Sequence, residues 1–443
     1  MCSAAFTLKP LVLHDPSHRS PPISAEEIRL TPREKDVLRG LVGDIARIAA
    51  LPVHREKAEL WRRLNDLESA RPMVWINEIP WHEMNVSDEL MLQTEHPWAR
   101  DWETTLRQAL YQWRHLPADM IMSNFIECPL AIASTDFGII EDVDVAKTDE
   151  ANPIVSRHFN IQIRQPEDLD KIKLPRITHN RAATEFRFAA MNEVCQGLMP
   201  VKPVGQTHIW YTPWDYLIRW YGVTEAMLDL HDRPDFVDAC VQRLASAWMT
   251  ELDQFVEQNL LSPDCNNTRI GSGGYGYTKA LPAADPATRV QPRQMWGCSN
   301  AQIFSEVSPE MHWEHALRHD LPWLSRWGLN YYGCCEPLDF KMDVLRHIPN
   351  LRKISMNYRI KLNRAVQNVQ DKYVFSYKPN PAFFAEDNFR LHEMRAELRA
   401  VLERARGCHV ELIMKDISTV RYQPQRLWQW ATMAMELVEE FKR

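Results

Sequence analysis

Two adjacent cysteines and a glutamate, Cys334, Cys335 and Glu336, lie between a glycine and a proline in the stretch GLNYYGCCEPLDF. Thiolates and carboxylates bind metal ions, and a thiolate is also a nucleophile. Successive strand residues point to opposite faces, so both thiols reach one cavity only if the chain bends at Gly333. The stretch therefore predicts a metal or thiolate site. The alternatives are a tight turn of small side chains and, for Glu336, a first-turn carboxylate of the next helix.

Other polar side chains follow predicted strands, where an α/β barrel places its catalytic groups. His208, Lys378 and Asp416 are the further catalytic candidates: histidine transfers protons, and Lys378 would hold a carboxylate of a substrate or folate. Candidate substrate contacts in the same segments are Asn124, Tyr211, Trp214, Gln302, Tyr332, Asn357 and Asn380. Structural alternatives remain open, such as backbone hydrogen bonding for His208, a solvated tip for Lys378, and a plain salt bridge for the Lys415–Asp416 step.

Apolar, β-rich runs alternate with helical patterns along most of the chain. Strands are expected at 71–79, 119–126, 201–211, 328–335, 351–357, 372–378 and 409–417, and helices at 212–222, 225–261, 308–327, 338–348 and 424–443. This alternation predicts a parallel α/β fold. Because no dinucleotide fingerprint or P-loop is present, a (β/α)8 TIM barrel fits better than a doubly wound sheet. The segment 269–292 is then expected to be a long active-site loop.

The N-terminal part differs in pattern from the rest. Residues 1–23 are rich in Pro, Ser and His and are expected to form a loose arm, followed by helices that begin with Ser24 and Glu27 as a capping box and with Pro32 in a first turn. We therefore expect two parts: an arm and helical extension over 1–70, and a barrel over 71–443.

Composition narrows the class of protein. The net charge is −7 and no basic tract occurs, which argues against nucleic acid or an anionic membrane surface as the main partner. No apolar stretch reaches the roughly 18 residues of a membrane-spanning helix. The nine cysteines show no disulfide framework and no signal peptide is recognised, so the expected location is the cytoplasm. The 16 tryptophans suit either a wide aromatic pocket or a large core.

Three stretches together resemble the uroporphyrinogen decarboxylase superfamily over roughly residues 75–443: LPADMIMSNFIECPLAIASTDFGI, IRQPEDLDKIKLP and GLNYYGCCEPLDFKMDVLRHIPNLRKISM. The stretch SPEMHWEHALRHDLPWL resembles the helix before the third. The resemblance implies a TIM barrel that performs decarboxylation or methyl transfer. In the family's methyltransferase branch a His-x-Cys-Gly strand holds zinc; Tyr332 and Cys334 match its His and Cys. A corrinoid would be carried by a partner protein, because Pro234 replaces the glycine that a cobalamin-binding motif needs at DLHDRP.

Two positions bear on the choice between the decarboxylase branch and the methyltransferase branch of this superfamily. Asn124 matches the decarboxylase's aspartate and lacks its negative charge, and Asp416 is the nearest ligand where the methyltransferase branch has its second cysteine. The leading hypothesis is an enzyme that moves a methyl group between a small methylated compound or folate and a corrinoid on a partner, with metal or thiolate activation at Cys334 and Cys335. The alternatives are a decarboxylase or other lyase acting on a small carboxylated molecule, and a non-catalytic ligand-binding barrel. The sequence also leaves open whether the protein forms a homodimer.

Overall fold

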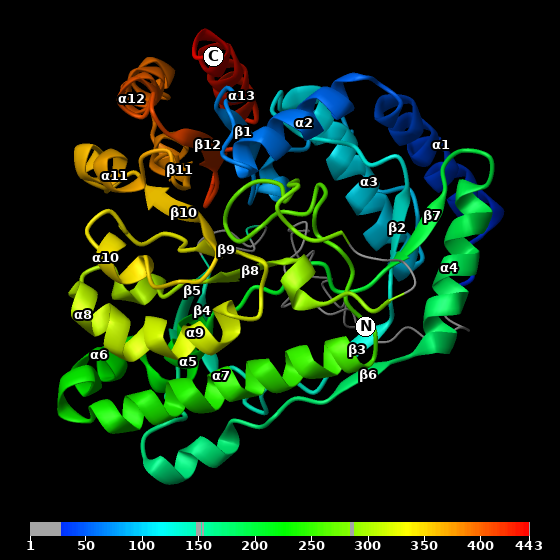
Figure 1. The fold of residues 1–443 in the computed structure, drawn as a ribbon. Helices are drawn as coiled ribbons and strands as arrows, with labels where there is room; N and C mark the ends of the chain where they lie inside the picture. Colours follow the sequence, from blue (N-terminus) through cyan, green and yellow to red (C-terminus); the bar gives the residue numbers. More distant parts are fainter. Residues whose placement is uncertain (1–27, 148–151, 153–154, 284–287, 443) are drawn as a thin grey trace.

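The computed structural model describes residues 28–147, 152, 155–283 and 288–442. Its main sheet contains six parallel strands: β1 (Met73–Ile76), β8 (Trp296–Ser299), β9 (Leu329–Tyr332), β10 (Leu351–Asn357), β11 (Val374–Lys378) and β12 (His409–Met414). Their spatial order is β1-β12-β11-β10-β9-β8 (Figure 1). Because all six run the same way, their carboxyl ends lie along one edge of the sheet.

The predicted α/β class with a parallel sheet is confirmed. The first strand pairs with the last, as in a (β/α)8 barrel, but the described strands do not close into a ring. β2 (Ile126–Pro129) pairs in parallel with β7 (Val201–Val204) as a separate two-stranded sheet. A backbone hydrogen bond from Asp119 N to the Val74 carbonyl (2.9 Å) connects β1 with the segment that precedes β2.

The strands alternate between two environments. Phe375 and Tyr377 of β11 lie in the large apolar core shared with the surrounding helices, which include α7 (Pro234–Glu257), α12 (Leu391–Arg404) and α13 (Gln425–Glu440). The intervening Ser376 and Lys378 face the opposite side, as the period of two requires. On that inner side Lys353 Nζ and Glu411 Oε2 form an ion pair of 3.0 Å between two fully buried side chains. The inner side of the sheet is therefore polar at several positions.

The segment expected to be an active-site loop packs against this inner side of the sheet. Gly271 has φ +55°, and a Cβ there would lie 2.4 Å from the Tyr331 ring, so only glycine allows the close approach. Ser272 Oγ is 2.9 Å from the Tyr331 hydroxyl, and Gly274 N donates to Glu411 Oε2 at 3.3 Å. The described part of this segment thus carries polar groups to the buried face of the sheet.

Helices precede the first strand, as expected. In α1 (Pro32–Ala49), Thr31 caps the helix in a capping box with Glu34. In α2 (Val53–Asn65), the buried Trp61 donates its indole N–H to the Asp119 carbonyl at 2.9 Å. The expected arm and the Ser24 cap lie outside the described residues. α2 packs on β1 and β12, while α1 packs on α3 (Pro97–His115) and α4 (Arg181–Cys195).

The remaining elements are short or lie between the strands of the main sheet. The predicted helix 225–261 is divided at Pro234, whose ring fits a first helical turn better than a helix interior. The other elements are η2 (Trp81–Glu83), β3 (Ile132–Ser134), β4 (Val143–Ala146), β5 (Ser156–Phe159), η3 (Pro166–Lys171), β6 (Ile177–His179), α5 (Pro213–Tyr221), α6 (Val223–Asp232), η4 (Pro292–Gln294), η5 (Gln302–Phe304), α8 (Pro309–His312), the π-helix η6 (Trp313–Leu317), α9 (Arg318–Leu324), α10 (Met342–Leu345), α11 (Leu362–Val369) and η7 (Pro381–Ala385).

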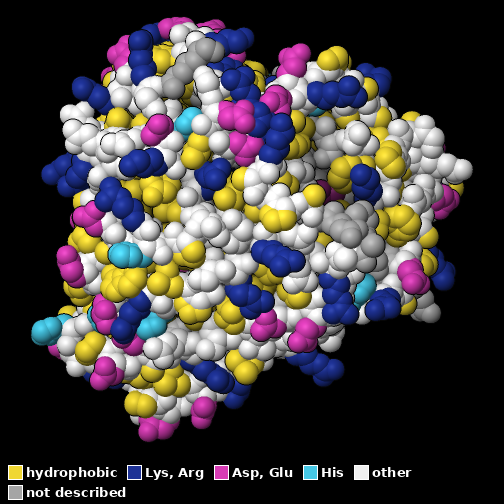
Figure 2. Space-filling model, viewed as in Figure 1, with side chains coloured by type: hydrophobic (Ala, Val, Ile, Leu, Met, Phe, Trp, Pro, Cys, Tyr) yellow, Lys and Arg dark blue, Asp and Glu magenta, His cyan; other side chains and the backbone are white. Residues whose placement is uncertain are grey.

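The surface shown in Figure 2 mixes basic and acidic side chains without an extended field of one sign. This distribution agrees with the small negative net charge of the chain. Within the described residues, every helix is too short or too polar to cross a bilayer.

Candidate functional site

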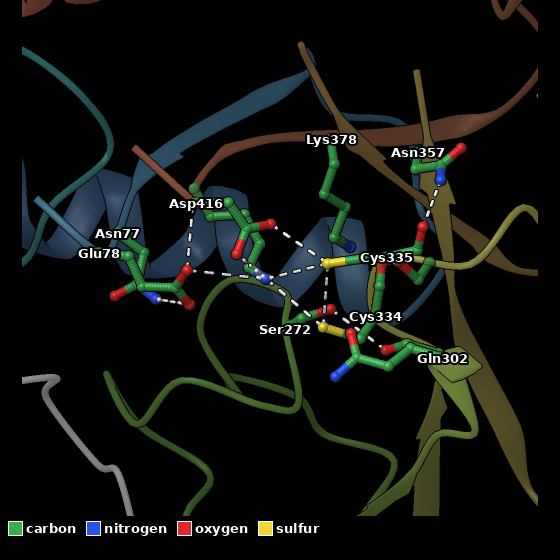
Figure 3. Close-up of polar contacts among 12 residues, drawn as sticks. Asn77, Glu78, Ser272, Gln302, Cys334, Cys335, Asn357, Lys378 and Asp416 are labelled. Atoms are coloured by element: carbon green, nitrogen blue, oxygen red, sulfur yellow. Dashed lines mark hydrogen bonds and ion pairs between the residues drawn. The ribbon is translucent and has the colours of Figure 1, made fainter. Parts of the chain in front are cut away.

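Polar side chains from four strands of the main sheet meet at its carboxyl edge (Figure 3). Glu78 follows β1, Asp416 follows β12, Lys378 ends β11, and Cys334 and Cys335 follow β9. These strands are neighbours or near neighbours in the sheet, so residues far apart in sequence are brought together. The carboxyl edge is where α/β proteins place their ligands, and we take this cluster as the candidate site.

The bend that the cysteines require is present. Gly333 has φ +99°, and a Cβ there would lie 2.5 Å from the Leu338 side chain and 2.9 Å from Ser355 Cβ. Glu336, which is fully buried, fixes the turn by accepting hydrogen bonds from Cys334 N (2.7 Å) and Ala301 N (3.4 Å). Burial raises the pKa of Glu336. Its role is to hold the bend, so its carboxylate faces backbone amides instead of the thiols.

The bend places both sulfurs beside one ammonium group. The two Sγ atoms are 3.5 Å apart, and Lys415 Nζ lies 3.4 Å from Cys334 Sγ and 3.6 Å from Cys335 Sγ. The Cys335 thiol donates to Asp416 Oδ2 at 3.2 Å. Cys335 is thus bound as a proton donor, whereas Cys334 receives the ammonium contact. The two sulfurs therefore differ in their hydrogen-bond partners: Cys335 has a carboxylate acceptor, and Cys334 does not.

The pKa values of Cys335 and Lys415 are both shifted by this arrangement. The hydrogen bond with Cys334, followed by burial, raises the pKa of Cys335 far above its usual range. Burial opposes the charge on Lys415, but Coulombic interactions with the acidic groups around it, Cys334 first, outweigh burial and hold the Lys415 pKa well above its ordinary value. Lys415 is therefore a permanent cation at this site.

Glu78 and Asp416 complete the charged edge. Both have left-handed backbone, with φ of 52° and 57°, a conformation that is unfavourable for these residues and is found at functional sites. Asp416 N donates to Glu78 Oε2 at 3.0 Å, and Lys415 Nζ lies 3.0 Å from Asp416 Oδ1. The Asp416 side chain is 47% exposed, so the site opens to solvent there. Burial raises the pKa of Glu78.

Lys378 occupies the inner part of the site. Its side chain projects from the end of β11 toward the cysteines (Figure 3) and is nearly buried. Nζ donates to the Tyr331 hydroxyl, to Ser376 Oγ at 2.7 Å and to the Ser376 carbonyl at 3.0 Å. Burial lowers the pKa of Lys378 to about 7. The pKa values of Lys378 and Lys415 are therefore shifted in opposite directions although the two residues share one site.

The donor set does not fit the zinc ion that the resemblance implies. Among the described residues, no group of three or more His, Cys, Asp or Glu side chains is arranged to hold a metal ion. Lys415 contacts both sulfurs and the Asp416 carboxylate, so an ammonium already takes the position of a cation. Tyr332 stands where a histidine ligand was expected, and its hydroxyl bonds to His312 Nε2 at 2.6 Å. We derive no step through a metal.

Some predicted contacts lie beside this cluster. Asn357 Nδ2 donates to the Cys335 carbonyl, and its Oδ1 accepts from Arg359 N at 2.9 Å. The Gln302 side chain donates to Asp215 Oδ2 at 2.8 Å. Asn357 therefore holds the backbone of Cys335, while Gln302 holds Asp215.

The other predicted site residues have structural contacts. His208 Nε2 accepts a hydrogen bond from Gly271 N at 3.0 Å, and Asn380 caps η7 through Ala382 N at 3.0 Å. The remaining aromatic candidates are core residues: Tyr211 stacks on Trp323 with ring centroids 4.5 Å apart, and the Trp214 indole donates to the His315 carbonyl at 2.9 Å.

Asn124 is exposed and lies just before β2, because the strand expected at 119–126 begins only at Ile126. The apolar run before it does not join a ladder. Asn124 therefore stands at the start of a strand and not at a carboxyl end, where it had been expected.

Sequence reasoning did not select Glu78, Tyr331 or Ser272, and it left open whether the Lys415–Asp416 step is a pair of site residues or a plain salt bridge. The signal for Glu78 was available, because it lies near the carboxyl end of the first predicted strand, as Asp416 lies near the end of the last. Tyr331 lies inside a strand and Ser272 in a loop, so nothing in their local sequence marked them.

Comparisons with known proteins give no family assignment. No protein-family model matches the chain, and no curated protein matches it. Among solved structures 22 chains match. One is described as a methyltransferase from Methanosarcina mazei; the alignment covers 86% of this chain and 98% of that chain at 10% sequence identity, with a TM-score of 0.48. At this level of similarity the likeness carries no weight for function. The resemblance to the decarboxylase superfamily stays a prediction.

Proposed function

We propose that this chain is a transferase that moves a methyl group through the Cys334 thiolate. The observation that supports it is the contact of the Lys415 ammonium with both sulfurs, together with the Cys335 hydrogen bond to Asp416. In this proposal Cys334 is the nucleophilic sulfur, because the Cys335 thiol donates to Asp416. The methylated partner would be a small compound or folate, and the other methyl carrier a corrinoid bound to a partner protein.

The first half-reaction is a displacement at the methyl carbon. The Cys334 sulfur forms a bond to that carbon while the carbon's bond to its leaving group breaks, and the bonding electron pair departs with the leaving group. Burial keeps the Glu78 carboxyl protonated to higher pH than usual, so it is placed to give a proton to a leaving oxygen or nitrogen.

The second half-reaction reverses the first toward a different nucleophile. A reduced corrinoid would attack the methyl carbon, the carbon–sulfur bond would break, and its electron pair would return to Cys334. Lys415 favours this step because its charge stabilises the departing thiolate. One cation thus supports the sulfur as nucleophile and as leaving group.

Incubation of the full chain with methylcobalamin or with methyl iodide tests the proposal. We expect one methyl group on the peptide that contains Cys334, and none there in Cys334→Ser. Cys265→Ser is the matched control, because Cys265 is more exposed than the buried Cys334 but its Sγ bonds to the Thr278 carbonyl at 3.0 Å, outside the site; this variant should be methylated at Cys334 like the wild type. Methyl iodide is used because a small reagent is needed to reach a buried sulfur, and its failure to modify Cys334 contradicts the proposal.

A further inference from the structure

Lys378 has hydrogen-bond partners that differ in kind from those of the other lysines buried in the sheet. Lys353 and Lys415 each contact a carboxylate, at 3.0 Å in both cases. The three contacts of Lys378 Nζ are neutral oxygens, namely the Tyr331 hydroxyl and the hydroxyl and carbonyl of Ser376. None of these groups needs a charged partner, so a neutral amine is accommodated there.

The electrostatic surroundings of Lys378 also favour the neutral amine. Burial is the main cause that lowers the pKa of Lys378 to about 7, and the Lys415 charge adds to it, while Glu411, Cys334 and Cys335 act in the opposite direction. About half of the Lys378 side chains are therefore neutral amines at neutral pH. A buried lysine next to another cation is a recognised way of making this amine a nucleophile.

A proton-transfer path leads from the amine into the loop. The Tyr331 hydroxyl lies next to Lys378 Nζ and is also 3.0 Å from Ser376 Oγ and 2.9 Å from Ser272 Oγ. Burial raises the pKa of Tyr331, so its hydroxyl keeps its proton and can exchange it with the serines. A reaction at the amine that consumes and releases protons therefore has hydroxyl groups in place.

We propose that Lys378 forms an imine with the carbonyl carbon of a small ketone or aldehyde, with β-keto acids as the substrate class. The amine nitrogen bonds to the carbonyl carbon, and the oxygen gains a proton by way of Tyr331 to give a carbinolamine. A second proton, taken up from solvent, then reaches the carbinolamine oxygen; the carbon–oxygen bond breaks, water leaves with the bonding electron pair, and a protonated imine remains. In a β-keto acid this cation accepts the electron pair of the bond to the carboxylate; carbon dioxide departs, and the resulting enamine takes up a proton. This activity is additional to methyl transfer and does not depend on it.

Acetylacetone is the first probe, because it converts a reactive lysine into a conjugated enaminone that absorbs in the near ultraviolet. With the full chain near neutral pH we expect the adduct on the peptide that contains Lys378. Formation should be more than roughly a hundredfold faster than on acetyl-lysine amide in free solution, because the pKa of about 7 leaves far more neutral amine than the ordinary value of about 10.4. Borohydride treatment in the presence of acetoacetate should fix a reduced adduct on the same residue.

Variants separate imine formation at Lys378 from methyl transfer at Cys334 and from reaction at a different lysine. Lys378→Arg should lose the enaminone signal, and Cys334→Ser should keep it, so failure of methyl transfer and failure of imine formation are distinguishable. Lys341→Arg is the matched control: Lys341 is also buried with a pKa lowered to about 8, but its Nζ bonds to His312 Nδ1 and the Phe304 carbonyl. Mapping of the wild-type adduct to Lys341 or another lysine, or absence of any adduct in the folded protein, overturns the inference even if the variants fail to fold.

Discussion

Replacement of Lys415 by methionine removes the positive charge that lies beside Cys334. At an effective dielectric constant of about 20, a unit charge 3.4 Å from the sulfur stabilises a thiolate by about 5 kcal/mol. Water at the open edge beside Asp416 screens part of this, and we take about 2–3 kcal/mol as the net effect. The corresponding loss of thiolate is roughly 30–150-fold.

The assay is the rate of alkylation of Cys334 by iodoacetamide, followed by peptide mass spectrometry near neutral pH. Lys415→Met should slow this rate by that factor, while Lys415→Arg should restore most of it and Lys372→Met, at an exposed lysine, should leave it unchanged. Circular dichroism and thermal unfolding establish that each variant is folded. An unaltered rate in folded Lys415→Met would refute the reasoning, because the Lys415 charge would then have no effect on the ionisation of Cys334.

Four further outcomes follow from the structure. A mild thiol oxidant should join Cys334 and Cys335, whose sulfurs are 3.5 Å apart, and the Cys334–Cys335 peptide should lose two hydrogens; dithiothreitol should reverse this easily, because adjacent residues form a strained disulfide. A chelator should leave the alkylation rate of Cys334 unchanged, and a large change in either direction would indicate a bound metal. Burial raises the pKa of Asp320 to about 7, above its unfolded value of about 3.9. The protonated carboxyl therefore stabilises the fold fully below about pH 4, and this stabilisation is lost as the pH rises to 7. The loss in the free energy of unfolding is at most roughly 4 kcal/mol. Asp320→Asn should flatten this part of the pH–stability curve measured by urea unfolding, and an identical curve would contradict the assignment. Asp119→Ala should destabilise the fold by about 3–5 kcal/mol, because Asp119 pairs with the buried Arg71 at 2.6 Å; a urea midpoint equal to that of the wild type would contradict this.

Much of the main sheet could be predicted from local pattern. The alternation in 351–357 gives β10 with the observed bounds, and the apolar runs that contain β1, β9, β11 and β12 were also predicted. Burial on one face and polar groups on the other produce a clear period of two in these strands. The bend at Gly333 followed from the same rule, because two neighbouring thiols need it to reach one cavity.

Other elements gave a weaker signal. β8 has only four residues and contains a glycine, and its run was not recognised as a strand. The run before Asn124 is apolar enough for a strand, but it forms no strand ladder. Whether a ladder forms depends on the neighbouring segment as well as on the run's own sequence. The helices α3 and α4 were not predicted, and the failure of the described strands to form a closed ring is a property of pairing across the whole chain.

The site was predicted in part. The thiols, Lys378 and Asp416 were selected because they follow strands, and the structure brings them together. The contact of Lys415 with sulfurs 80 and 81 residues away in sequence could not be read from either segment, and it places an ammonium beside both thiols. His208 and Tyr332 have the chemistry of site residues, but their hydrogen bonds hold other parts of the fold.

The far-ultraviolet absorbance of thiolate, compared between the wild type and Cys334→Ser at neutral pH, tests most directly whether Cys334 is anionic. We predict a difference of one thiolate per chain, which disappears when Lys415→Met is compared with the corresponding double variant. Equal spectra at neutral pH, with the difference emerging only in alkaline solution, would show that Cys334 is an ordinary protonated thiol and would contradict the role proposed for it.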